Sequence, residues 1–181
     1  RSRGKIRVAT RGVYASLEQS CGVLPQGQRG RESMSQDEAT ARVCIGLDVG
    51  TVRIGVATHA DGADYAMPHS TVEARPLKKA CEEIAELVQE RSVDTIVVGW
   101  PLDMDGSEGR AVRRVKKVID ALTKELDARG HVFEVIEWDE RLTTTSAEAM
   151  LIGADVSRGR RKQVIDQVAA AHILEGYLKS L

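Results

Sequence analysis

The chain has 181 residues, of which 42% are hydrophobic and 29% charged, and its formal net charge is −1. This composition suits one globular domain, and no apolar run reaches the roughly 18 to 20 residues that a membrane-spanning helix needs. Aromatic residues make up only 3% of the chain, which disfavours nucleic-acid binding dominated by base stacking. The three cysteines form no CxxC pair and no zinc spacing, so we expect a reducing, cytoplasmic compartment and no membrane association.

The first 33 residues differ in charge from the remainder of the chain. Residues 1–33 contain seven Lys or Arg and two acids, or +5, whereas residues 34–181 contain 19 basic and 25 acidic residues, or −6. The segment has no helical or strand period, and Met34 resembles a natural start. We expect 1–33 to be a disordered or non-native extension, with a transit peptide as the alternative, and one domain over 42–181. Because the domain is acidic, a polyanionic partner would need local basic patches or metal ions.

From residue 42 onward, the hydrophobic pattern predicts three hairpin-linked strands followed by alternating strands and helices. The predicted strands are 42–48, 53–59, 66–72, 93–101 and 131–138. The predicted helices are 77–88, 107–130, 145–153 and 161–178. Pro68 confines the third strand to an edge or a bulge, Ser107 is expected to cap the second helix, and the continuous apolar run 93–101 predicts a central strand. This order predicts an α/β fold with a five-stranded mixed sheet and helices on both faces.

Acidic residues stand where predicted strands end. Asp48 closes the first strand, Asp139 and Glu140 follow the fifth, and Asp166 lies in the first turns of the last helix. If strands one, four and five are parallel, their carboxyl ends share the sheet edge at which ligands bind. Carboxylates gathered there repel one another, and Mg²⁺ or Mn²⁺ would relieve that repulsion and support phosphodiester cleavage. Taken singly, each acid also fits a turn, a surface ion pair or a helix N-terminus.

Residues suited to phosphate binding flank these acids. Gly50 leaves the backbone beside the first strand free of side-chain bulk, and Thr51 can offer its amide or hydroxyl to a phosphate. Ser107 would begin a helix at the ligand edge, and Arg141 is a candidate phosphate clamp. A glycine-containing loop with four basic residues is expected to grip the nucleic-acid backbone. The candidate substrate-binding residues are Gly50, Thr51, Arg53, Ser107, Arg141, Arg158, Arg160, Arg161 and Lys162.

Four motifs resemble the YqgF family, whose members are described as candidate Holliday junction resolvases and candidate pre-16S rRNA nucleases. The motifs are GLDVGTVRIGVA, VVGWPLDMDGSEG, DERLTT and VIDQVAAAHILEGYL, and the resemblance covers residues 42–181. It implies a ribonuclease-H-like fold and a nuclease that uses Mg²⁺ or Mn²⁺ on structured nucleic acid, either precursor rRNA or branched DNA. It also implies three metal ligands and catalytic acids, namely Asp48, Glu140 with Asp139 beside it, and Asp166. Trp100 stands where the family usually has Leu, and we expect it to pack in the core.

Two other functions fit parts of the pattern. An Asp-x-Gly-Thr turn between two strands also occurs in ATPases of the sugar-kinase, chaperone and actin superfamily, but that fold needs two such domains. A non-catalytic RNA-binding protein on the same fold is the second alternative, although such a protein would be expected to lose one of the acids. The sequence leaves open the choice between RNA and DNA, and between a monomer and a homodimer.

Overall fold

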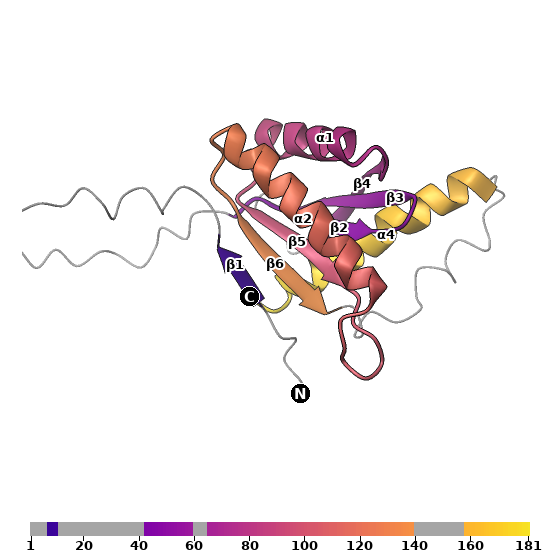
Figure 1. The fold of residues 1–181 in the computed structure, drawn as a ribbon. Coiled ribbons are helices and arrows are strands. Elements are labelled where there is room, and N and C mark those ends of the chain that lie inside the picture. Colours follow the sequence, from indigo (N-terminus) through magenta and orange to yellow (C-terminus); the bar gives the residue numbers. More distant parts are fainter. Residues whose placement is uncertain (1–6, 11–41, 60–64, 140–157) are drawn as a thin grey trace, which may run out of the picture.

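A computed structural model of the protein describes residues 7–10, 42–59, 65–139 and 158–181. The predicted short helix at 145–153 lies outside these residues. Figure 1 shows a mixed β-sheet with helices packed against it, which confirms the predicted α/β class. Within the described ranges, every helix is too short or too polar to cross a lipid bilayer.

The sheet has the strand order β1-β6-β5-β2-β3-β4. Its strands are β1 (Arg7–Thr10), β2 (Cys44–Val49), β3 (Arg53–His59), β4 (Ala66–Glu73), β5 (Thr95–Trp100) and β6 (Glu134–Asp139). Strands β2, β5 and β6 are parallel, whereas β3, β4 and β1 each run antiparallel to the strand beside them. The five predicted strands are confirmed, and the short strand β1 is added beside β6 from within the segment 1–33. The native or non-native origin of that segment stays a prediction.

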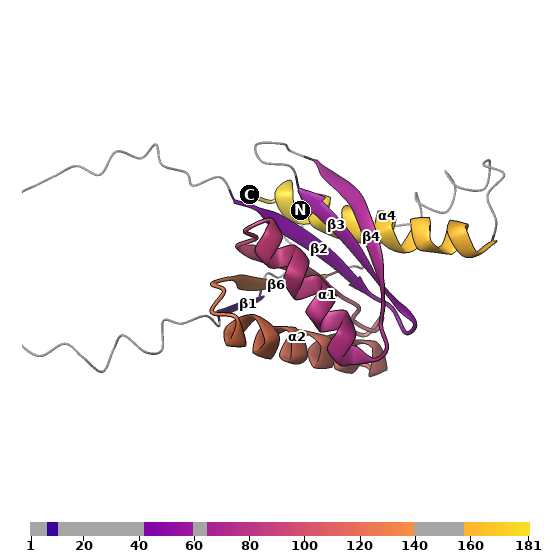
Figure 2. The same cartoon turned by 90° about the horizontal axis from the view of Figure 1, so that it is seen from above.

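In the described part of the chain, three helices cover the two faces of the sheet (Figure 2). They are α1 (Leu77–Glu90), α2 (Arg110–Ala128) and α4 (Arg158–Leu178). Because side chains alternate along a strand, β2 sends Ile45 and Leu47 into the core beneath α1 and α2, and Cys44 into the smaller core beneath α4. Strand β5 is buried at every position, as its continuous apolar run predicts. The two faces of β2 therefore serve two different cores.

The structure tests two local predictions, the position of the strand that contains Pro68 and the helix cap at Ser107. Strand β4 is an edge strand whose register with β3 shifts beside Pro68, as expected. The predicted cap at Ser107 is wrong, because α2 begins at Arg110 after Gly109. The Ser107 amide instead donates a hydrogen bond to Asp105 Oδ1 at 2.9 Å, within a turn that precedes the helix. Ser107 therefore lies in an Asx-type turn before the helix, and its hydroxyl lies 3.5 Å from Asp103 Oδ2.

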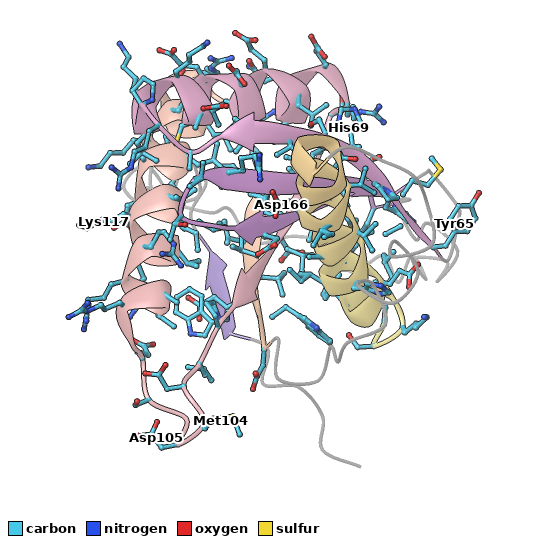
Figure 3. All side chains as sticks on the ribbon, turned by 90° about the vertical axis from the view of Figure 1, so that its right-hand side faces the viewer. Tyr65, His69, Met104, Asp105, Lys117 and Asp166 are labelled. Atoms are coloured by element: carbon cyan, nitrogen blue, oxygen red, sulfur yellow. The ribbon has the colours of Figure 1, made fainter. Side chains whose placement is uncertain are left out.

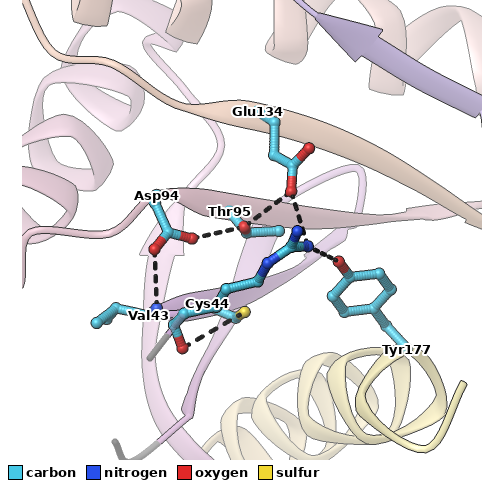
Figure 4. Close-up of polar contacts among 7 residues, drawn as sticks. Val43, Cys44, Asp94, Thr95, Glu134 and Tyr177 are labelled. Atoms are coloured by element: carbon cyan, nitrogen blue, oxygen red, sulfur yellow. Dashed lines mark hydrogen bonds and ion pairs between the residues drawn. The ribbon is translucent and has the colours of Figure 1, made fainter. Parts of the chain in front are cut away.

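A polar network fixes α4 at the end of the sheet where β2, β5 and β6 begin (Figure 4). Arg42 Nη1 lies 3.3 Å from both Glu134 Oε1 and the hydroxyl of Tyr177, and the Thr95 hydroxyl contacts the carboxylates of Asp94 and Glu134. Tyr177 belongs to the last turn of α4. At about 1.5 Å per residue, the helix therefore carries residue 166 about 16 Å away, toward the edge where the parallel strands end.

The two described cysteines are buried and free. Burial raises the pKa of both Cys44 and Cys81 to about 11. At pH 8 only about one thiol in a thousand would be ionised, and the thiolate is the nucleophile. We therefore expect iodoacetamide to leave both residues unmodified in the native protein and to label both in urea, as read by peptide mass spectrometry. Rapid labelling of either residue in the folded protein would contradict this packing.

Candidate active site

Asp48 lies on the face of the sheet that α4 covers. It is the fifth residue of β2, so strand alternation puts it on the same side as Cys44 and Gly46. In the β2–β3 ladder Asp48 is paired with Gly55, which presents no side chain on that side. The carboxylate thus stands close to the carboxyl end of β2, beneath the first turns of α4.

Two glycines allow α4 to lie directly on the strands. A Cβ atom added to Gly46 would stand 2.6 Å from the carbonyl oxygen of Ala170, and one added to Gly55 would overlap the carbonyl oxygen of Asp166. Asp166 and Ala170 are one helical turn apart, so the same side of α4 rests on both glycines. Gly55 is the ladder partner of Asp48, so the close approach of α4 at Gly55 brings Asp166 next to Asp48.

The proximity of two carboxylates changes the chemistry of Asp48. The pKa of Asp48 is raised to about 6, mainly by burial and secondarily by the negative charge of Asp166, while Arg114 acts in the opposite direction. Arg114 reaches the site from α2 and donates its Nε hydrogen to the carbonyl oxygen of Val49 at 3.3 Å. A carboxylate that is desolvated and close to a second one attracts cations strongly, because water screens its charge poorly.

Asp166 has its own cationic partner. The Nε group of Arg53 donates a hydrogen bond to Asp166 Oδ2 at 2.8 Å, and the two side chains are only 18% and 23% exposed. Figure 3 shows Asp166 on the side of α4 that faces the strands. Sequence patterns do not indicate this ion pair, because its two residues are 113 positions apart and each belongs to a different predicted element.

Strand alternation separates the two acids at the end of β6. Ile136 and Trp138 belong to the core beneath α4, whereas Val135 belongs to the core beneath α1 and α2. Asp139, which pairs with Trp100 in the parallel ladder, therefore falls on the side of Val135, opposite Asp48. Glu140 follows it and lies outside the described residues.

The donor set in the described part of the site suits a hard cation but is incomplete. Asp48 and Asp166 offer only oxygen atoms, which Mg²⁺ and Mn²⁺ prefer, and both carboxylates sit at one sheet edge. No group of three or more His, Cys, Asp or Glu that could hold a metal ion occurs among the residues that the structure describes. The described chain thus supplies two carboxylates of a set in which Mg²⁺ would keep several waters.

The nine substrate-binding candidates lie in several separate segments of the chain. Thr51 is exposed in the turn after β2, and Gly50 closes that turn, since an added Cβ would stand 2.6 Å from the Arg53 carbonyl oxygen. Ser107 is exposed in the segment that follows β5, at the same sheet edge. Arg141 lies outside the described residues. Arg53 is the partner of Asp166 described above. The other four candidates were expected on a loop, but their backbone belongs to the start of α4, which begins three residues earlier than the predicted helix. These four residues are Arg158, Arg160, Arg161 and Lys162.

Trp100 ends β5 at this edge and is packed in the core, as expected, with 6% of its surface exposed. The ammonium group of Lys116 lies 5.6 Å from the centroid of the Trp100 ring and also pairs with Glu108. Lys116 belongs to α2, whose exposed side carries further basic residues. Those exposed residues are Arg110, Arg113 and Lys117. A positively charged helix face therefore borders the edge that holds Asp48.

The chain matches the model of a known family and several curated proteins. The family is RuvX, described as Holliday junction resolvase, and the match spans residues 42–180. A protein of Clostridium tetani named "Putative pre-16S rRNA nuclease" is 41% identical over 137 residues, which cover 76% of this chain and 96% of that protein. A protein of the same name from Halalkalibacterium halodurans is 45% identical over 136 residues, which cover 74% of this chain and 94% of that one.

A solved structure supports the fold. T. thermophilus RuvC in complex with Holliday junction substrate aligns with a TM-score of 0.50 at 15% identity, over 76% of this chain and 95% of that chain. At this level of identity the likeness concerns the arrangement of sheet and helices. It agrees with the ribonuclease-H-like fold that the sequence motifs imply.

Proposed function

The chain belongs to the RuvX family, described as Holliday junction resolvase, and on this premise we propose that it is a nuclease that uses Mg²⁺ or Mn²⁺ to hydrolyse phosphodiester bonds in structured nucleic acid. Its proposed substrate is the precursor of 16S rRNA, cleaved at the 5′ end in the cytoplasm, because that substrate stands in the names of the curated relatives. Branched DNA is the alternative, which the description of the family favours. The observation that carries the proposal is that Asp48, which is largely shielded from water, lies beside a second carboxylate, Asp166.

The residues that would hold the metal are Asp48, Asp166 and Glu140. Glu140 is preferred to Asp139 because alternation along β6 puts Asp139 on the far side of the sheet from Asp48. When bound, divalent ions activate a water molecule and stabilise the leaving oxygen of a phosphodiester. The chain supplies desolvated carboxylates at fixed positions, because α4 rests on Gly46 and Gly55 without intervening side chains.

The proposed nucleic-acid contacts lie around that edge. Thr51 and Ser107 offer hydroxyl and amide groups, and the exposed basic residues of α2 neutralise backbone phosphates. The start of α4 adds the positive end of the helix dipole, which attracts phosphate. Because such contacts release counterions, we expect affinity for nucleic acid to fall steeply as salt rises.

A direct assay separates this function from its alternatives. Purified protein with Mn²⁺ is expected to cleave a 5′-extended 16S rRNA precursor fragment faster than a four-way DNA junction, and EDTA is expected to stop cleavage of both. Faster cleavage of the junction would reverse the choice of substrate. Binding of both nucleic acids without any cleavage would favour the non-catalytic RNA-binding protein, and ATP turnover without cleavage would favour the ATPase.

A further inference from the structure

The ion pair between Arg53 and Asp166 places a cation where the proposed metal would bind. Arg53 is the first residue of β3 and lies two positions before Gly55, so both face α4. The backbone of Asp166 packs against Gly55, and the Arg53 Nε group donates a hydrogen bond to the Asp166 carboxylate at 2.8 Å. Both side chains of the pair are largely shielded from water, so their attraction is screened less than that of a surface pair.

The charges around the two acids explain why such a cation is needed. Asp48 and Asp166 are close enough for their negative charges to repel each other. Arg114 opposes this repulsion from the side of Asp48, and Arg53 neutralises Asp166 directly. Without a divalent ion, these two arginines are the positive groups that the described residues bring to the pair of carboxylates. A divalent ion that enters the site would find one of its proposed ligands, Asp166, already paired with Arg53.

We propose that Arg53 is the counter-cation of Asp166 in the metal-free protein and that a divalent ion displaces it on binding. This inference rests on the proposed function, since it takes Asp166 as a metal ligand. The ion and the guanidinium compete for the same carboxylate, and their like charges repel across a poorly screened site. Once released, the guanidinium remains at the ligand edge, where its planar set of donors matches a backbone phosphate. Metal binding thereby prepares Arg53 to bind the substrate.

Competition predicts an unusual pair of effects for Arg53→Ala. The variant is expected to bind Mn²⁺ about tenfold more tightly, because the metal no longer has to break a charge-assisted hydrogen bond. Cleavage by the same variant is expected to fall at least about tenfold, because the phosphate partner is gone. Arg53→Lys keeps the positive charge and is expected to bind Mn²⁺ with nearly parental affinity. If Arg53 merely oriented Asp166, its removal would weaken Mn²⁺ binding instead.

Isothermal titration of the full chain with Mn²⁺, without nucleic acid, tests this competition. Arg129→Ala is the matched control, because Arg129 Nε pairs with Glu125 at 2.9 Å with similar exposure on the far end of α2. It is expected to leave Mn²⁺ affinity unchanged. Arg53→Gln removes the charge but keeps hydrogen-bonding groups, and it should bind Mn²⁺ as tightly as Arg53→Ala. This second variant keeps the test valid if Arg53→Ala fails to fold.

The possible results distinguish failure of the counter-cation role of Arg53 from failure of the proposed metal-dependent function. Unchanged or weaker Mn²⁺ binding by both Arg53→Ala and Arg53→Gln would overturn the counter-cation role while leaving the metal site intact. Failure of the parent protein to bind Mn²⁺, or equal binding by Asp48→Asn, would overturn the proposed metal-dependent function itself. Tighter binding that also occurs in Arg129→Ala would assign the effect to net charge alone and would likewise contradict the proposal.

Discussion

Replacing Asp48 with asparagine is expected to lower cleavage by about a thousandfold or more, the scale of loss that follows removal of a central catalytic group. The substitution keeps the size of the side chain but removes the negative charge that a divalent ion would bind. Folding is expected to persist, because asparagine fits the same place in β2 without a buried charge. The measurement is a single-turnover cleavage assay with Mn²⁺. Asp127→Asn, at an exposed position of α2, is the control that should cleave at the parental rate.

The same variant is expected to be more stable than the parent in EDTA at neutral pH. The pKa of Asp48 is raised from 3.8 to about 6 in the folded protein, so the folded state holds its proton more tightly than the unfolded state. Parental stability from this group is complete below pH 4 and is lost as the pH rises through 6. The gain for Asp48→Asn should therefore grow from near zero at pH 4 to about 1 to 3 kcal/mol at pH 8.

Urea unfolding at the two pH values checks this dependence. A parental rate of cleavage by Asp48→Asn would remove Asp48 from the active site. Equal free energies of unfolding for variant and parent at both pH values would show that the carboxylate is not buried beside Asp166 as described.

Gly55→Ala is expected to cost about 3 kcal/mol or more of folding free energy and to weaken Mn²⁺ binding. The new methyl group would overlap the backbone carbonyl oxygen of Asp166, which cannot move without shifting α4 off the sheet. That shift would carry the Asp166 carboxylate away from Asp48. Urea unfolding and Mn²⁺ titration measure the two effects on one preparation.

Two other glycines provide controls for the Gly55 substitution. A Cβ at Gly176 would stand 2.8 Å from Trp138 Nε1, a side-chain atom, so Gly176→Ala should cost less. Gly130 has φ +67° and nothing within 4 Å of an added Cβ, so Gly130→Ala should cost about 1 kcal/mol and leave Mn²⁺ affinity unchanged. Equal losses in Gly55→Ala and Gly130→Ala would contradict the direct contact between β3 and α4.

Local patterns were sufficient to predict the three described helices and five of the six described strands, but they did not predict β1. The buried strand β5 follows from its continuous apolar run, and the edge position of β4 follows from Pro68. The start of α2 was predicted wrongly because Ser107 is a good capping residue, and the sequence does not reveal that Ser107 belongs to a turn that precedes the helix. Sequence periodicity reports which face of an element is apolar, and it is weakest at the ends of elements.

The pairing of distant residues was the part of the site that the sequence could not predict. Asp48 was recognised as unusual because a carboxylate ends an apolar strand, but Arg53 gave no sign of pairing with a residue on α4. Gly55 reads as an ordinary strand glycine until the helix that packs on it is known. The separation of Asp139 from Asp48 likewise depends on which core each side of β6 faces. Such contacts depend on tertiary packing.

Anomalous scattering from a crystal soaked in Mn²⁺ would locate the proposed metal relative to the two carboxylates. We expect a manganese peak about 2 Å from carboxylate oxygens of both Asp48 and Asp166. We also expect Arg53 Nε to have left Asp166 Oδ2. Manganese bound elsewhere at full occupancy, with the Arg53–Asp166 pair intact and nothing at Asp48, would contradict both expectations.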